Sequence, residues 1–236
     1  LPAPEDTDNP FGYKFSWSPR GVLLASKNSA HYLKDGEEVV VPGEELFDHC
    51  DIVPIEVEGE MTEFEGYPNR DSLPYMETYG ITSTKTMFRG TLRNQGWCAT
   101  MRKMVDLGLL DGEPRDGLGG LTCAEFTGGL IDGSPDVLKP QLADHLDVEE
   151  GSRVMSNLAW LGLLSDDRLP LKKGTAPIDI LTARMLKKMS YKEGERDMLI
   201  LQHQFVAQYP DRKEEISSTM IDFGLRLAGQ SGRVSV

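Results

Sequence analysis

The stretch Met198-Leu199-Ile200-Leu201-Gln202-His203-Gln204-Phe205-Val206 decides the fold class of this chain. Leu199, Leu201 and Phe205 occupy alternate positions in it, and a period of two is typical of a β-strand with one buried face. The turn residues Pro210-Asp211-Arg212 follow, and the run 216–223 is expected to be the returning strand. The pattern therefore predicts a long hairpin within 191–224, and its alternation requires one buried face.

The rest of the chain combines short apolar runs with helical periodicity. The runs, each bounded by turn residues, predict strands at 38–41, 52–57, 64–67 and 87–92. Helical spacing predicts helices at 95–110, 121–130, 135–146, 149–163 and 176–189, with Thr175 as the cap of the last. We expect an α+β fold, in which a mixed or antiparallel sheet is covered by helices mainly on one face.

These elements divide one expected domain, residues 1–236, into five parts. Residues 1–17 are rich in proline and acidic side chains and are expected to form an extended connecting segment. An α/β part at 18–110, a helical part at 111–190, the hairpin at 191–224 and a tail at 225–236 follow. The length suffices for a substantial hydrophobic core.

The composition is that of an ordinary globular protein with a strong acidic bias. The formal charge is −13 and the isoelectric point about 4.8, so nucleic acid and anionic membranes would repel the chain. No apolar run approaches the roughly 18 residues of a membrane span, and no signal-peptide segment is present, so we expect no membrane partner. A site for an anionic ligand would need local positive charge.

Cysteine and histidine spacings indicate neither a disulfide framework nor a metal site. Cys50, Cys98 and Cys123 are widely spaced without a Cys-x-x-Cys pair, which favours a reduced, cytoplasmic setting. Cys98 lies in an apolar helical pattern and is interpreted as a buried free thiol. The four histidines lack the i, i+4 spacing of a metal site, so we assign no metal ligand.

Two arginines in turn-like settings are the strongest candidates for ligand binding. Arg70 lies in Gly66-Tyr67-Pro68-Asn69-Arg70-Asp71-Ser72, and Arg93 ends Phe88-Arg89-Gly90-Thr91-Leu92-Arg93. A guanidinium presents a planar fork of donors that matches a carboxylate, so two such groups suit a small acid with more than one carboxylate. Both are expected just beyond strand ends. The alternative is that both form ordinary surface ion pairs.

Ser18-Pro19 has the signature of a helix start, and the helix is expected to run from 19 to about 28. Trp17, Ser18 and Pro19 would then lie at a positively polarised helix N-terminus. Such a terminus accommodates a cofactor phosphate, an amide or a substrate carboxylate. Simple capping is the alternative interpretation.

Longer motifs surround these residues in a fixed order. They are Leu1-Pro2-Ala3-Pro4-Glu5, Tyr13-Lys14-Phe15-Ser16-Trp17-Ser18-Pro19-Arg20-Gly21, Tyr67-Pro68-Asn69-Arg70-Asp71-Ser72, Arg89-Gly90-Thr91-Leu92-Arg93, Glu193-Gly194-Glu195-Arg196-Asp197-Met198 and Thr219 to Gly224. In these motifs the chain resembles the saccharopine dehydrogenase family, the L-glutamate-forming enzymes of lysine metabolism. The resemblance is weakest over 111–174.

The resemblance implies an oxidoreductase that acts on the CH–NH bond of saccharopine with NADP or NAD. The residues that match the family's saccharopine-binding motifs are Arg70, Thr91, Leu92 and Arg93. Those that match its segment beside the dinucleotide are Trp17, Ser18 and Pro19. It further implies a homodimer, and a nucleotide-binding domain of the same protein as partner. Because the family's proton-handling residues lie in that domain, no general acid or base is assigned here.

The nucleotide-binding part of such an enzyme needs a Gly-x-Gly-x-x-Gly turn between a strand and a helix. No such turn follows an expected strand here, and the chain begins at Leu1. We therefore expect the substrate domain of a larger enzyme, inactive on its own. After Asp222-Phe223-Gly224 the chain also departs from the family's glycine-rich turn and closing helix. Two alternatives stay open: a domain for a carboxyspermidine-type substrate, and a non-catalytic binding or dimerisation module.

Overall fold

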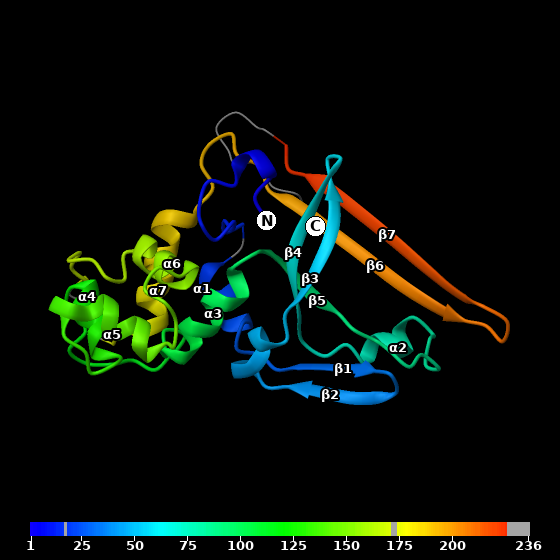
Figure 1. The fold of residues 1–236 in the computed structure, drawn as a ribbon, viewed down its shortest axis with the longest axis horizontal. Helices are drawn as coiled ribbons and strands as arrows, with labels where there is room; N and C mark the ends of the chain where they lie inside the picture. Colours follow the sequence, from blue (N-terminus) through cyan, green and yellow to red (C-terminus); the bar gives the residue numbers. More distant parts are fainter. Residues whose placement is uncertain (17, 171–173, 226–236) are drawn as a thin grey trace.

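The computed structural model describes residues 1–16, 18–170 and 174–225. Its helices are α1 (Pro19–Ala25), α2 (Pro74–Thr78), α3 (Trp97–Asp106), α4 (Cys123–Gly129), α5 (Leu138–His145), α6 (Arg153–Leu161) and α7 (Pro177–Met189), with 3-10 turns η1 (Pro4–Asp6), η2 (Gly43–Asp48) and η3 (Pro135–Val137). Its strands are β1 (Ala30–Lys34), β2 (Glu37–Val41), β3 (Asp51–Val57), β4 (Glu60–Pro68), β5 (Gly90–Asn94), β6 (Met198–Gln208) and β7 (Lys213–Phe223). The predicted α+β class is confirmed: most helices gather at one end, and the strands occupy the other (Figure 1).

The described strands form three separate antiparallel sheets, whereas the sequence predicted a single one. The orders are β1-β2, β3-β4-β5 and β6-β7. The hairpin β6-β7 contacts the central sheet through side chains and not through an edge, because Met198 at its base packs with Ile55, Val57 and Phe64. Periodicity reports which face of a strand is apolar, but it carries no information on which edges pair.

The predicted hairpin is confirmed, but it is buried only at its base. The two strands pair from Met198 with Phe223 to Gln208 with Lys213, and the return strand begins three residues earlier than predicted. Figure 1 shows the far half of the hairpin projecting away from the group of helices that contains α3 to α7. Leu199 is half-buried, while Leu201 and Phe205 are 46% and 53% exposed. The buried face that alternation predicted is therefore mostly uncovered in this chain.

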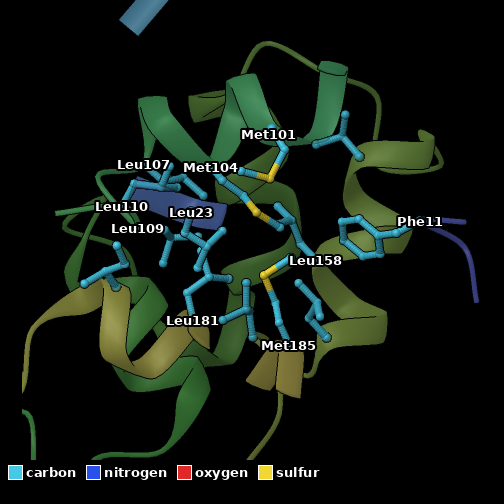
Figure 2. Close-up of a cluster of buried hydrophobic side chains, with 14 of the residues drawn as sticks. Phe11, Leu23, Met101, Met104, Leu107, Leu109, Leu110, Leu158, Leu181 and Met185 are labelled. Carbon is cyan, nitrogen blue, oxygen red and sulfur yellow. The ribbon is translucent and has the colours of Figure 1, made fainter. Parts of the chain in front are cut away.

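The main core lies between the helices (Figure 2). The predicted apolar stripe of α3 supplies Trp97, Met101 and Met104, which are fully buried. They pack with buried side chains of α1, α6 and α7, among them Leu23, Leu158, Leu181 and Met185. Burial of this apolar surface is the main stabilising contribution to the helical part.

Several predicted boundaries differ from the structure for local reasons. Helix α1 begins at Pro19 as predicted, but it ends at Ala25, since the following amides of Lys27 and Asn28 bond three residues back in a tighter turn. The cap of α7 is Ala176 and not Thr175, because the Asp179 carboxylate accepts the Ala176 N–H at 3.1 Å.

Two strands were misjudged near the candidate site. The strand expected at 87–92 is β5 at Gly90–Asn94, because Met87 exchanges two backbone hydrogen bonds with Leu33 instead. Strand β1 was missed altogether, although Asp35-Gly36 is a strong signal of a two-residue hairpin turn. Both residues have positive φ, as a type I′ turn requires.

No helix within the described part of the chain is long and apolar enough to cross a membrane.

Candidate functional site

The central sheet brings the two arginine motifs side by side. Strands β4 and β5 pair antiparallel, so that Glu65 lies opposite Arg93, Tyr67 opposite Thr91 and Pro68 opposite Gly90. Directly paired residues point to the same face of a sheet. Thr91 and Arg93 therefore share the face that carries Tyr67, which packs toward the helical core.

Leu92 points to the opposite face. Its side chain packs on the second cluster, beside Phe64 and Ile55, underneath the hairpin. Any direct contact of Leu92 with a ligand would therefore involve its backbone.

The loop after β4 is tied to β5 by Asn69. Its side-chain amide donates to Thr91 Oγ1, and its backbone N–H donates to the Arg89 carbonyl at 3.2 Å. Ser72 closes the same loop, since its hydroxyl accepts the Arg89 N–H at 3.1 Å. The other side-chain atom of Asn69, Oδ1, is buried and has no hydrogen-bond partner among the described residues. A buried acceptor without a partner is unusual and is available to a ligand or water.

Arg70 sits two residues beyond the end of β4, as predicted. Its backbone is left-handed, with φ of 53°, and its carbonyl accepts the His31 N–H at 2.9 Å. Non-glycine residues adopt this conformation infrequently, and it costs free energy that the surrounding bonds must offset. The side chain is exposed, and it forms no ion pair or hydrogen bond within the described ranges. The surface ion pair that was the alternative interpretation is absent there.

Arg93 lies within β5, not beyond its end, which corrects the prediction. Its guanidinium carbon is 4.8 Å from the ring centroid of Tyr13 and 5.3 Å from that of Trp97. One terminal nitrogen donates to the Leu92 carbonyl at 2.8 Å, while Nε is buried without a partner in the described structure. No carboxylate of the described residues pairs with it. The cation is thus held by aromatic rings and keeps donors for a further acceptor.

The charge of Arg93 also acts on the two tyrosines beside it. Burial raises the pKa of the Tyr13 hydroxyl and of the Tyr67 hydroxyl, and the nearby guanidinium opposes that rise. Both phenols therefore stay protonated at neutral pH. They offer neutral hydroxyl groups near the cation, and no competing negative charge.

Tyr13 was not singled out by the sequence, because an aromatic residue in a proline-rich segment carries no signal of its partner. Arg89 was also overlooked, although it lies in the same motif as Arg93. Its terminal nitrogen donates to the Tyr75 hydroxyl at 2.8 Å, and Tyr75 stacks on Tyr79 with centroids 5.8 Å apart. These residues lie next to the Asn69 loop, because the Asn69 N–H donates to the Arg89 carbonyl.

Lys14 and Asp71 do not join this group. Lys14 is 1% exposed, and its amine pairs with Asp8 at 2.8 Å and Glu195 at 2.7 Å, which makes it a structural ion pair. Asp71 caps its own turn by accepting the Leu73 N–H at 3.0 Å.

The predicted cofactor segment is described only in part. Trp17 lies outside the described residues. Ser18 caps α1 by accepting the Gly21 N–H at 3.5 Å, and Pro19 is the first helical residue. Helix α1 packs on α7, where Arg20 pairs with Asp179 at 3.2 Å. Simple capping accounts for the contacts of Ser18 that the structure contains.

Comparison with known proteins shows the family to which the chain belongs. The family of saccharopine dehydrogenase C-terminal domains matches residues 1–233. The chain is 39% identical over 232 residues to saccharopine dehydrogenase [NADP(+), L-glutamate-forming] of Saccharomyces cerevisiae, covering 95% of this chain and 51% of that protein. It is equally similar, at 39% over 239 residues, to the protein of the same name from Schizosaccharomyces pombe, of which it also covers 51%.

A longer relative and a solved structure are also similar to this chain. The mitochondrial alpha-aminoadipic semialdehyde synthase of Bos taurus is 37% identical over 219 residues, which are 89% of this chain and 23% of that protein. Among solved structures, apo saccharopine dehydrogenase (L-Glu forming) from Saccharomyces cerevisiae aligns with a TM-score of 0.83 and 39% identity, over 96% of this chain and 52% of that one. The chain spans about half the length of the fungal relatives that it matches. It belongs to the saccharopine dehydrogenase C-terminal domain family.

Proposed function

We propose that this chain forms the saccharopine-binding part of an NADP-dependent saccharopine dehydrogenase of lysine metabolism. The observation that carries the proposal is Arg93, a cation that lies over the adjacent rings of Tyr13 and Trp97 and whose buried Nε has no partner among the described residues. The family membership and the names of the relatives support the choice of substrate and cofactor.

The spacing of the two arginines suits an extended ligand with separated carboxylates. Arg93 is the β-strand partner of Glu65, strand β4 ends three residues after Glu65 at Pro68, and Arg70 lies two residues beyond that end. Five residues of chain span at most about 17 Å, a separation that long arginine side chains can shorten from both ends. Saccharopine joins lysine to a glutarate unit through a secondary amine, so that its carboxylates are distributed along the molecule. Arg70 and Arg93 would each hold a different carboxylate, with Thr91 and the Leu92 backbone between them.

The reaction is the reversible oxidation of the saccharopine CH–NH bond. A bound nicotinamide would supply the hydride acceptor, and water would hydrolyse the oxidised substrate to aminoadipate semialdehyde and glutamate. The role of this chain is orientation, because hydride transfer requires the substrate carbon to be held against the nicotinamide ring. The phosphate-binding turn for the dinucleotide belongs to a further domain of the protein, and Trp17, Ser18 and Pro19 would contact the dinucleotide from this side.

The proposal includes a homodimer formed through the hairpin. Leu201 and Phe205 of β6 are paired with Met220 and Ile216 of β7, so the four side chains lie on one face. Their exposed fractions lie between 46% and 54%, which leaves an uncovered apolar surface. A second copy would cover this face, and the family resemblance implies a homodimer built through this domain. A reducing, cytoplasmic location is part of the proposal and is supported by the free thiols of Cys50, Cys98 and Cys123.

Steady-state kinetics of the full-length protein test the function. Saccharopine and NADP should give reduced NADP and glutamate, whereas the 236-residue chain alone should be inactive. Turnover of a carboxyspermidine-type substrate but not of saccharopine would favour the alternative dehydrogenase. If saccharopine neither turns over nor raises the melting temperature of the full-length protein, the proposal is wrong.

A further inference from the structure

Two cysteines that are far apart in the sequence meet beside the candidate site. Cys50 directly precedes β3, and Cys98 lies in the first turn of α3. Glu65 lies on β4, which comes between these two elements in the sequence. The two sulfur atoms and a carboxylate oxygen of Glu65 all lie within 4.8 Å of one another. This cluster is separate from the hydrogen bonds that hold Asn69 and from the aromatic contacts of Arg93.

The three side chains are positioned by the fold. Glu65 is held from both sides, because one carboxylate oxygen accepts the Gly96 N–H and the other accepts the Cys98 N–H, each at 2.7 Å. Cys98 is 3% exposed, whereas Cys50 is half-buried and gives access from solvent. Ligating carboxylates in metal sites are commonly oriented by such hydrogen bonds from the surrounding protein. Each oxygen retains a lone pair for a cation.

The donor types select a class of metal. Two thiolates and one carboxylate suit a borderline-soft divalent ion such as Zn²⁺, with water as the fourth ligand. Tetrahedral Zn–S distances of about 2.3 Å require sulfur atoms about 3.7 Å apart, so closure by roughly 1 Å at most is needed. Histidine is not required for such a site.

The charges of the cluster are also consistent with a cation. Two thiolates and a carboxylate together carry three negative charges, which repel one another in a partly buried position. A divalent ion offsets this repulsion with its positive charge, and it deprotonates the thiols that coordinate it.

We propose that Cys50, Cys98 and Glu65 bind one Zn²⁺-class ion in a structural site. The ion would join the start of β3, strand β4 and the first turn of α3. Trp97 precedes Cys98 in the chain, and Arg93 is the strand partner of Glu65. The metal would therefore stabilise the positions of Trp97 and of strand β5, which hold the Arg93 guanidinium, without contacting the substrate.

Metal titration of the reduced, metal-free full-length protein tests this proposal. Cd²⁺ should bind with one ion per chain and produce a thiolate-to-metal absorption band, and Zn²⁺ should displace it. Cys50→Ser should abolish the band, and it is the preferred variant because the half-buried position tolerates a hydroxyl. Glu65→Gln should weaken binding by about 10- to 100-fold. Cys123→Ser is the matched control, since Cys123 is a buried free thiol outside the cluster, and it should leave the titration unchanged.

Two outcomes would overturn the metal site. One is the absence of thiolate-to-metal absorption, or its persistence in Cys50→Ser. The other is a Cys50–Cys98 disulfide found by mass spectrometry, in a protein that takes up no metal after reduction. Because the readouts are absorption and metal content, they are independent of saccharopine turnover.

Discussion

The side chain of Asn69 donates a hydrogen bond to the hydroxyl of Thr91, and this bond joins the loop that carries Arg70 to the strand that carries Arg93. The two residues are 22 positions apart in the sequence. Asn69 Oδ1 and Arg93 Nε are both buried and have no hydrogen-bond partner among the described residues. The Asn69–Thr91 bond therefore fixes two motifs that still hold one free acceptor and one free donor for a ligand.

Thr91→Val should loosen this connection. Valine has nearly the same shape but removes the acceptor, which leaves the Asn69 amide without that partner at a cost of about 1–3 kcal/mol in the free energy of unfolding. We expect the KM for saccharopine of the full-length protein to rise more than kcat falls, as for a positioning residue. Urea unfolding and steady-state kinetics measure the two effects. Thr219→Val is the control, because the Thr219 hydroxyl accepts from Gln202 on the exposed hairpin. Unchanged stability and KM in Thr91→Val would show that the bond contributes nothing.

Arg70→Ala and Arg93→Ala should each weaken saccharopine binding by about 10- to 150-fold, which corresponds to a charge-assisted contact of about 1.5–3 kcal/mol. Lysine at either position should recover only part of the loss, because a point charge cannot reproduce the bidentate fork. The Michaelis constant for NADP should stay nearly unchanged. Kinetics with substrate and cofactor varied separately measure both constants.

Arg212→Ala is the control for both variants, since Arg212 lies at the tip of the hairpin and pairs with Asp211 and Glu214. If the Arg70 and Arg93 variants keep the wild-type constants for saccharopine, neither residue clamps a carboxylate.

The acid stability of the chain should depend on Asp8. Hydrogen bonds from Lys14 and Lys192 lower the pKa of Asp8 from 3.8 to about 2. A lowered pKa in the folded state stabilises the protein above the unfolded-state pKa, and the contribution is lost as the pH falls from about 4 to about 2. Asp8→Asn should therefore be less stable than wild type at neutral pH and should lose less stability within that window. Urea unfolding at several pH values measures this. Parallel curves for the two proteins would contradict the assignment, and Asp211→Asn on the exposed turn should leave the curve unchanged.

Phe205→Glu should convert the proposed dimer to a monomer at micromolar concentration. The substitution places a charge on the apolar face that Phe205 shares with Ile216, and burying an unpaired carboxylate is costly. Light scattering after size-exclusion chromatography gives the mass. Gln204→Glu is the matched control, because Gln204 is the neighbour of Phe205 on β6 and points to the other face. A dimer that survives Phe205→Glu, or a wild-type monomer, would place the interface elsewhere or remove it.

Local pattern was sufficient for much of the secondary structure. The alternation around Leu201 predicted the hairpin, the spacing of Met101 and Met104 predicted α3, and Ser18-Pro19 predicted the start of α1. All are short-range properties, because side-chain periodicity and capping depend on neighbours within a few residues. The arginine motifs were visible for the same reason, and with the other ordered motifs they were enough to identify the family.

Tertiary structure alone decided which of these pieces meet. The division into three sheets, the position of Arg93 over Tyr13 and Trp97, and the meeting of Cys50 with Cys98 depend on strand register and on contacts between distant segments. A sequence pattern shows which face of an element is apolar, but many arrangements bury the same faces. The spacing of three isolated cysteines indicated no metal ligand, and only the packing of α3 against β4 assembled two of them around a carboxylate.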